Sequence, residues 1–144
     1  MKKMIYEILN EVENASNVAD KIAILRQNND NTALKTYATW ALLPGIQWNI
    51  PEGRPPFKVL KTAPGTGESN LYKELRRLVR LIKGAPNELT GKALVRESLF
   101  ISILEMLEEP EAELLLAIKD KEFNKLYPTL NAALFNEAYP EIKL

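Results

Sequence analysis

Two groups of basic side chains are the residues of this chain best suited to recognise an anion. The first group belongs to a helix expected from about residue 69, where steps of 100° per residue place five cations opposite a leucine stripe: Lys73, Arg76, Arg77, Arg80 and Lys83. Arginines one helical turn apart can clamp a phosphate through paired hydrogen bonds. The alternative interpretation is a solvated helix face whose cations complement the helix dipole.

The second group lies in segment 40–61, which contains both tryptophans and four of the nine prolines. Aromatic faces beside cations are suited to holding a purine and its phosphates. The two groups together predict a ligand site made of Trp48, Arg54, Phe57, Lys58, Lys61, Arg76, Arg77 and Arg80. Alternatively, the aromatic side chains only pin an irregular connection onto a helical core. The sequence leaves both interpretations open.

This chain has few of the residue types that usually carry out catalysis. The absence of cysteine and histidine removes thiolate nucleophiles, imidazole bases and the usual zinc ligands. Segment 63–69 resembles a phosphate-binding P-loop but has Glu68 where lysine is required and Thr62 where glycine is required. The acidic run 105–113 is interpreted as two meeting helix ends, with a hard-cation site as the alternative. We therefore expect no enzyme, no catalytic residue, no metal and no cofactor.

These residues must be positioned by helices, because apolar residues recur at helical spacing along most of the chain. The predicted fold is all-α: a single compact domain of about six to seven short helices, with a long proline- and aromatic-rich loop between the third and fourth. The expected parts are a three-helix segment 1–43, the loop 44–68 and the C-terminal helices 69–144. Helix 91–108 is apolar around most of its circumference, which predicts a central, buried helix. Expected N-caps are Asn17 or Ser16 for the second helix, Thr66 to Ser69 for the fourth and Thr129 for the last.

Composition limits the partners and the location. Nineteen basic and nineteen acidic residues give no net charge, which disfavours bulk binding of nucleic acid. Glu7 and Glu11 interrupt the apolar N-terminal stretch before it can form a signal-peptide core. No apolar run approaches the roughly 18 residues of a membrane helix. A cytoplasmic protein with no membrane contact is expected.

Three segments carry a resemblance to a known family: 6–12, 20–25 and above all Ile50-Pro-Glu-Gly-Arg-Pro-Pro-Phe-Lys58. They resemble an uncharacterised family of small proteins in T4-like phages and cyanophages, which has a comparable Leu-Pro-Glu-Gly-x-Pro-Pro-Tyr segment. We call residues 51–56 the proline box. Ile50 and Phe57 depart from the family's leucine and tyrosine, and the second change removes a phenolic hydroxyl. The resemblance implies a phage origin and an intracellular role during infection, and it implies no catalytic residue.

The favoured hypothesis is a non-enzymatic phage protein that binds and sequesters an anionic, phosphate-bearing small molecule, such as a nucleotide-type host defence signal. The loop aromatics and the arginines of the fourth helix would form the site, which subunits of a homo-oligomer could complete between them. The alternative is an adaptor or inhibitor whose proline-rich loop docks onto a host or phage protein. Nucleic-acid binding by the basic helix is the third hypothesis.

Overall fold

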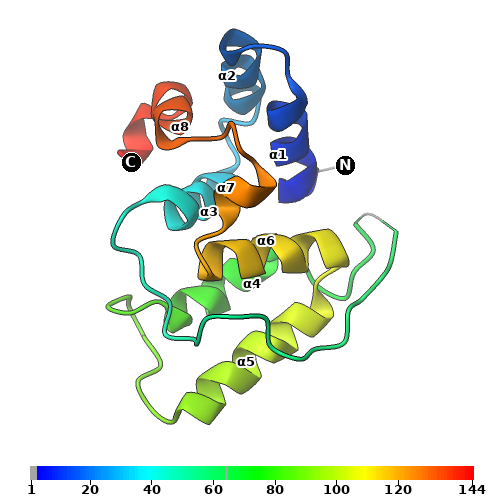
Figure 1. The fold of residues 1–144 in the computed structure, drawn as a ribbon, viewed down its shortest axis with the longest axis vertical. Coiled ribbons are helices and arrows are strands. Elements are labelled where there is room, and N and C mark those ends of the chain that lie inside the picture. The colour runs from blue at the N-terminus through cyan, green and yellow to red at the C-terminus, as the bar shows by residue number, and fades with distance from the viewer. Residues whose placement is uncertain (1–2, 64) are drawn as a thin grey trace. The chain divides into compact units, whose positions relative to one another are not determined.

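The computed structural model describes residues 3–63 and 65–144, and these residues contain helices but no β-strand (Figure 1). The α-helices are α1 (Ile5–Asn14), α2 (Val18–Gln27), α3 (Thr32–Leu42), α4 (Leu71–Leu78), α5 (Ala93–Met106), α6 (Glu109–Lys119), α7 (Phe123–Leu126) and α8 (Ala132–Ala138). Two short 3-10 helices, η1 (Val79–Leu81) and η2 (Pro140–Ile142), accompany them. The predicted all-α fold class is confirmed. A long irregular loop separates α3 from α4.

The chain forms two compact units, and it passes from one to the other at Pro44 and again at Asp120. The terminal unit combines α1, α2 and α3 with the last segment, 121–144. The central unit consists of residues 45–120 and therefore holds the loop together with α4, α5 and α6. Among the described residues, no helix combines the length and apolarity that crossing a lipid bilayer requires.

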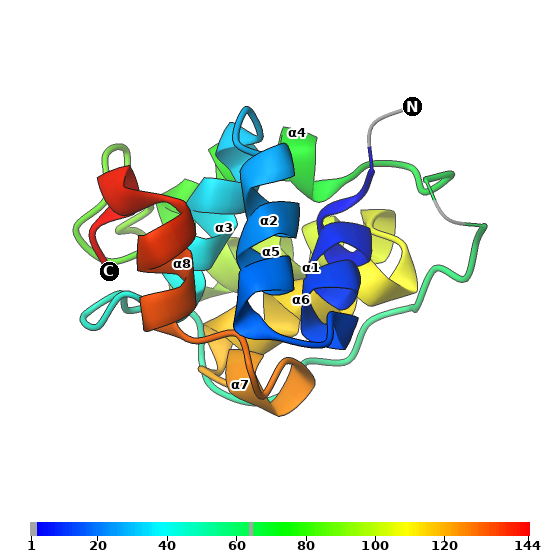
Figure 2. The ribbon, with the colours of Figure 1, turned by 90° about the horizontal axis from the view of Figure 1, so that it is seen from above.

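The terminal unit is built on α2, against which both α1 and α8 pack (Figure 2). Helix α1 buries one face, formed by Ile5, Tyr6, Ile8, Leu9 and Val12. The ammonium of Lys21 on α2 donates to the carbonyls of Val12 and Glu13, each at 2.9 Å, and so caps the C-terminus of α1. The hydroxyl of Tyr139 donates to the Leu25 carbonyl. This last contact joins segments that lie far apart in the sequence.

Asparagine side chains cap four helices. The side-chain oxygens of Asn17, Asn31, Asn70 and Asn131 accept the backbone N–H three residues ahead at 2.8 to 3.1 Å, at the starts of α2, α3, α4 and α8. Asn17 was one of the two predicted caps of α2. The cap predicted at Thr129 was wrong, because its hydroxyl and N–H both donate to the carboxylate of Glu13.

The central unit is organised around α6. Its buried residues are Glu111, Ala112 and all six from Leu114 to Lys119. The sequence predicted this central position for helix 91–108, and that prediction was wrong: α5 buries only Phe100, Ile103 and Leu104. Its first turn leaves Leu94 and Val95 72% and 56% exposed. Apolar composition indicates that a helix has faces to bury, but it does not say which faces receive a neighbour.

The loop before α4 is fixed to the central unit by backbone hydrogen bonds at both ends. Near its start, Asn49 N–H donates to the Leu81 carbonyl at 2.7 Å and Lys83 N–H donates to the Gln47 carbonyl at 2.8 Å. Near its end, Glu109 N–H donates to the Leu60 carbonyl at 3.0 Å. The intervening stretch, which contains the proline box, passes over α5.

Candidate functional site: the proline box and its cavity

The proline box is held in place by a lysine from the end of α6. The ammonium of Lys119 donates to the carbonyls of Pro51 and Gly53, both at 2.9 Å, and to the Asp120 carboxylate at 2.6 Å. These bonds use all three N–H donors of the ammonium, whose side chain is fully buried. Asp120 in turn accepts the N–H of Gly53 at 3.2 Å. The turn of the box is therefore clamped from both its N–H and its C=O groups.

Gly53 is required by the backbone conformation of this turn. Its φ is +98°, a value that residues with a Cβ rarely adopt. An added Cβ would meet no atom within 4 Å, so space is not the constraint. The glycine serves to point two carbonyls and one N–H at Lys119 and Asp120.

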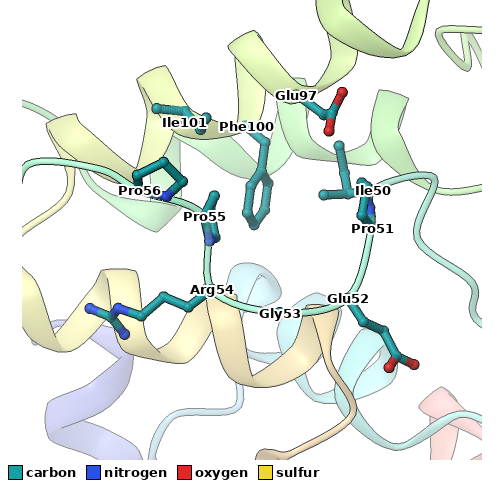
Figure 3. A pocket seen from close by; sticks show the side chains of 10 residues that line it. All are labelled: Ile50, Pro51, Glu52, Gly53, Arg54, Pro55, Pro56, Glu97, Phe100 and Ile101. Atoms are coloured by element: carbon teal, nitrogen blue, oxygen red, sulfur yellow. The ribbon is translucent and has the colours of Figure 1, made fainter.

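Residues 50–56 form an arch over α5 that encloses a cavity of about 280 Å³ (Figure 3). The ring of Phe100 projects from α5 into this arch. Most of the lining is apolar, and it comprises Ile50, Pro51, Pro55, Pro56, Phe100 and Ile101, with Glu52, Gly53, Arg54 and Glu97 completing it. The cavity is therefore a small apolar depression with charged side chains at its edge.

Two carboxylates and one guanidinium belong to the lining of this cavity. Arg54 turns away from the cavity (Figure 3), and its guanidinium donates to both carboxylate oxygens of Glu113, at 2.8 and 3.1 Å. The same guanidinium lies 5.0 Å from the centre of the Phe57 ring. The side-chain carboxylate of Glu97, in contrast, makes no hydrogen bond or ion pair within the described part of the chain. The cation is neutralised while the Glu97 carboxylate is not.

A second cavity, of about 410 Å³, lies between the loop and a later part of α5. Its lining consists of Lys58, Val59, Leu60, Glu68, Ser102, Glu105 and Met106. Both cavities are therefore formed by α5 together with the loop before α4.

Three glutamates hold the loop through its backbone. Glu105 accepts the N–H of Lys58 at 2.8 Å, and Glu108 accepts that of Gly65 at 2.9 Å. Glu111 receives the N–H of Leu71, at 3.2 and 3.3 Å from its two oxygens, at the first turn of α4. We call these three residues the carboxylate set. The interpretation of the acidic run 105–113 as two meeting helix ends does not predict these hydrogen bonds to the loop backbone.

The surroundings of Glu111 shift its pKa. Its side chain is completely buried, and burial raises its pKa to about 7. The Leu71 N–H opposes this shift, and the neighbouring Glu108 adds to it. Glu108 is also buried, and its Oε1 has no hydrogen-bond partner within the described chain. A proton on Glu111 therefore relieves both desolvation and repulsion.

The arginines of the fourth helix lie on other elements of the central unit and have their own contacts. Arg77 donates to Glu74 from Nε and Nη2, both at 2.7 Å. Arg80, in η1, donates to the Asn87 carbonyl at 3.2 Å. Arg76 is exposed, as the predicted cationic face requires. None of the three lines either of the two cavities under the loop.

The predicted ligand residues of the loop are thus only partly brought together. Arg54 and Phe57 stack on each other, Lys58 lines the second cavity, and Lys61 is exposed. Trp48 is only 8% exposed and pairs with Ile82 in an isolated antiparallel bridge. Its ring belongs to the core of the central unit and offers little surface to a ligand.

Most of the chain matches a known protein family. The model described as "Family of unknown function (DUF6433)" matches residues 8–125. The chain belongs to this family. A comparison with curated proteins finds no match. The region shared with DUF6433 contains the complete proline box, both cavities, Lys119 and the carboxylate set.

In this DUF6433 chain, the functional geometry rests on residues that the sequence did not single out. Lys119 and Glu97 were absent from the predicted site, although each has a weak signal. Lys119 directly follows the apolar run 114–118, where a charge at the end of a buried helix needs a partner. Glu97 is a charged residue within helix 91–108, whose apolar residues spread around most of its circumference. Neither signal indicates which residues form the other side of the contact.

Proposed function

We propose that this protein is a non-enzymatic adaptor or inhibitor that binds a partner protein through the proline box and the adjoining face of α5. The observation that carries the proposal is the exposure of Leu94, 72%, and Val95, 56%, at the start of α5. Helical spacing places Leu94 on the same face as Ile101, which lines the cavity. We call Leu94, Val95, Glu97, Ile101 and the proline box the docking surface.

An exposed apolar surface next to a cavity is typical of protein interaction sites. The anionic-ligand hypothesis has less support at this place, because Arg54 is already paired with Glu113, and Glu52 and Glu97, the other two charged residues of the lining, are both acidic. The arginines of α4 and η1 line neither cavity. Of the functions considered, docking of a protein requires the fewest changes to these contacts.

The rigidity of the box favours this role as well. Lys119 and Asp120 fix the backbone of the arch before any partner arrives. A prearranged surface loses less conformational entropy on binding than a flexible loop would lose. The proline residues further restrict the chain.

The setting is part of the proposal. The resemblance of segments 6–12, 20–25 and 50–58 to phage proteins supports the further proposal that this protein acts in the cytoplasm of an infected host cell. Its partner would be a host or phage protein. The choice between the two is made by the experiment below.

The test uses a photo-crosslinking amino acid in place of Leu94, in the full chain made in infected cells. We expect one protein partner to be crosslinked, and mass spectrometry then identifies the partner and the crosslinked residue. The matched control places the same amino acid at Val18, which is 61% exposed on the terminal unit. An Ile101→Glu substitution should abolish the crosslink from position 94, because it puts a charge into the apolar lining.

Three results would refute the proposal. They are equal crosslinking from both positions, a crosslink to a second copy of the same chain only, and a crosslink that persists with Ile101→Glu while circular dichroism shows an unchanged fold. A nucleotide that copurifies with the protein and is lost on Arg76→Glu would instead support the anionic-ligand hypothesis.

A further inference from the structure

We infer that the docking surface recognises a short extended segment of the partner, in which an apolar side chain stands two positions from a lysine or arginine. This inference rests on the proposed function and adds the chemistry of the partner. The apolar side chain would enter the cavity under the proline box, and the cation would pair with Glu97.

The cavity is large enough for one apolar side chain of any size. Its volume of about 280 Å³ lies at or below the lower end of the roughly 300–1,000 Å³ typical of small-molecule pockets. Pro51, Pro55, Phe100 and Ile101 present apolar surface to it, and the ring of Phe100 lies within the arch (Figure 3). Such a lining favours an aliphatic or aromatic group over a polar one.

The charge of Glu97 at the rim of the cavity indicates which kind of residue should accompany the apolar side chain in the partner segment. The carboxylate of Glu97 has no partner within the described chain, while Arg54 is turned toward Glu113. Glu52 also carries a carboxylate, but its side chain points away from the cavity (Figure 3). A cation of the partner therefore finds one suitably placed counter-charge, and an anion would be repelled by it.

The spacing along α5 sets the spacing in the partner. Glu97 and Ile101 lie four residues apart, which is about 6 Å along a helix axis. In an extended chain, side chains two positions apart point to the same side and are separated by about 6.6 Å. An extended segment lying along α5 can therefore place one side chain on Glu97 and the next on that side in the cavity. The following side chain would reach the second cavity, beside Ser102 and Glu105.

The probes are synthetic nonapeptides of serine and threonine with a central leucine and lysine two positions before and after it. In matched peptides the lysines are replaced by glutamate, or the leucine is replaced by serine. Binding to the full-length, isotope-labelled protein is measured by NMR titration. Replacing lysine by glutamate in the peptide should weaken its binding by about two- to fivefold, the range expected for a partly exposed ion pair.

Glu97→Gln should remove this preference for lysine, whereas Glu137→Gln should retain it, because Glu137 is an exposed residue of the terminal unit and lines neither cavity. Ile101→Glu should remove the preference for leucine. The inference is overturned if lysine confers no preference, if the preference survives in Glu97→Gln, or if n-butylamine competes as strongly as the lysine peptide and so identifies a small-amine site. A partner crosslinked at Leu94 through a segment without a cation would overturn this inference alone and leave the proposed function standing.

Discussion

Replacing Glu111 by glutamine should make the protein more stable at neutral and alkaline pH, although it removes a carboxylate that accepts a hydrogen bond. Burial raises the pKa of Glu111 from 4.5 to about 7. Between these values the folded protein keeps the proton while the unfolded chain releases it. Stability contributed by the protonated side chain is therefore complete below about pH 4.5 and is lost as the pH rises through 7.

The size of the stability change follows from the size of the pKa shift of Glu111. One pKa unit corresponds to 1.36 kcal/mol, so the shift of Glu111 from 4.5 to about 7 costs on the order of 3 kcal/mol of unfolding free energy above pH 7. Glutamine stays neutral at every pH, and its amide oxygen can still accept the N–H of Leu71. The stability difference between variant and wild type should therefore grow by about 3 kcal/mol in favour of the variant from pH 4 to pH 8.

The assay is urea unfolding at several pH values, followed by the fluorescence of the two tryptophans, one of which, Trp48, is buried in the central unit. Glu109→Gln is the matched control, because it removes the same charge from the same helix without touching Leu71. A pH-independent difference for Glu111→Gln, or an equal pH-dependent gain in the control, would refute the role assigned to Glu111.

Three further predictions use the same unfolding assay. Lys119→Met should lower the free energy of unfolding by about 3–5 kcal/mol, because the Asp120 carboxylate and two carbonyls of the proline box lose the cation that they contact. A loss below about 1 kcal/mol would contradict the role of Lys119 in holding the box. Gly53→Ala should cost about 1–2 kcal/mol through its φ of +98° alone, and an unchanged midpoint would show that the turn relaxes. Asn131→Ala should cost about 1 kcal/mol by uncapping α8, whereas a neutral result would assign the cap elsewhere.

The helices of this protein were readable because their signals are local. The apolar stripe of α1 recurs every three or four residues in the sequence, and its members Ile5, Ile8, Leu9 and Val12 are all buried. Asn17 could be named as a cap because an N-cap bonds to a backbone group only three residues ahead. Periodicity and capping both operate within about one turn, so a single sequence contains all the information they need.

The arrangement of the candidate site could not be predicted because its contacts join distant segments. Lys119 reaches Pro51 and Gly53 across more than sixty residues. Its partners are backbone carbonyls, which every residue possesses, so no residue type in the box marks the contact. The packing of α8 against α2 could not be predicted for a similar reason. Apolar stripes indicate that helix faces are buried, but they do not indicate which faces meet.

The carboxylate set has a consequence for how the loop can vary. Glu105 and Glu108 bond to the backbone N–H groups of Lys58 and Gly65, and Glu111 bonds to the start of α4. A backbone N–H remains when the side chain is exchanged, provided that the new residue is not proline. Exposed loop side chains can therefore change without releasing the loop from α5 and α6. Leu94 and Val95 of the docking surface are likewise exposed, whereas Gly53 is needed for the turn of the proline box. Substitutions at the exposed positions should therefore alter the proposed partner binding before they alter folding, and substitution of Gly53 should affect both.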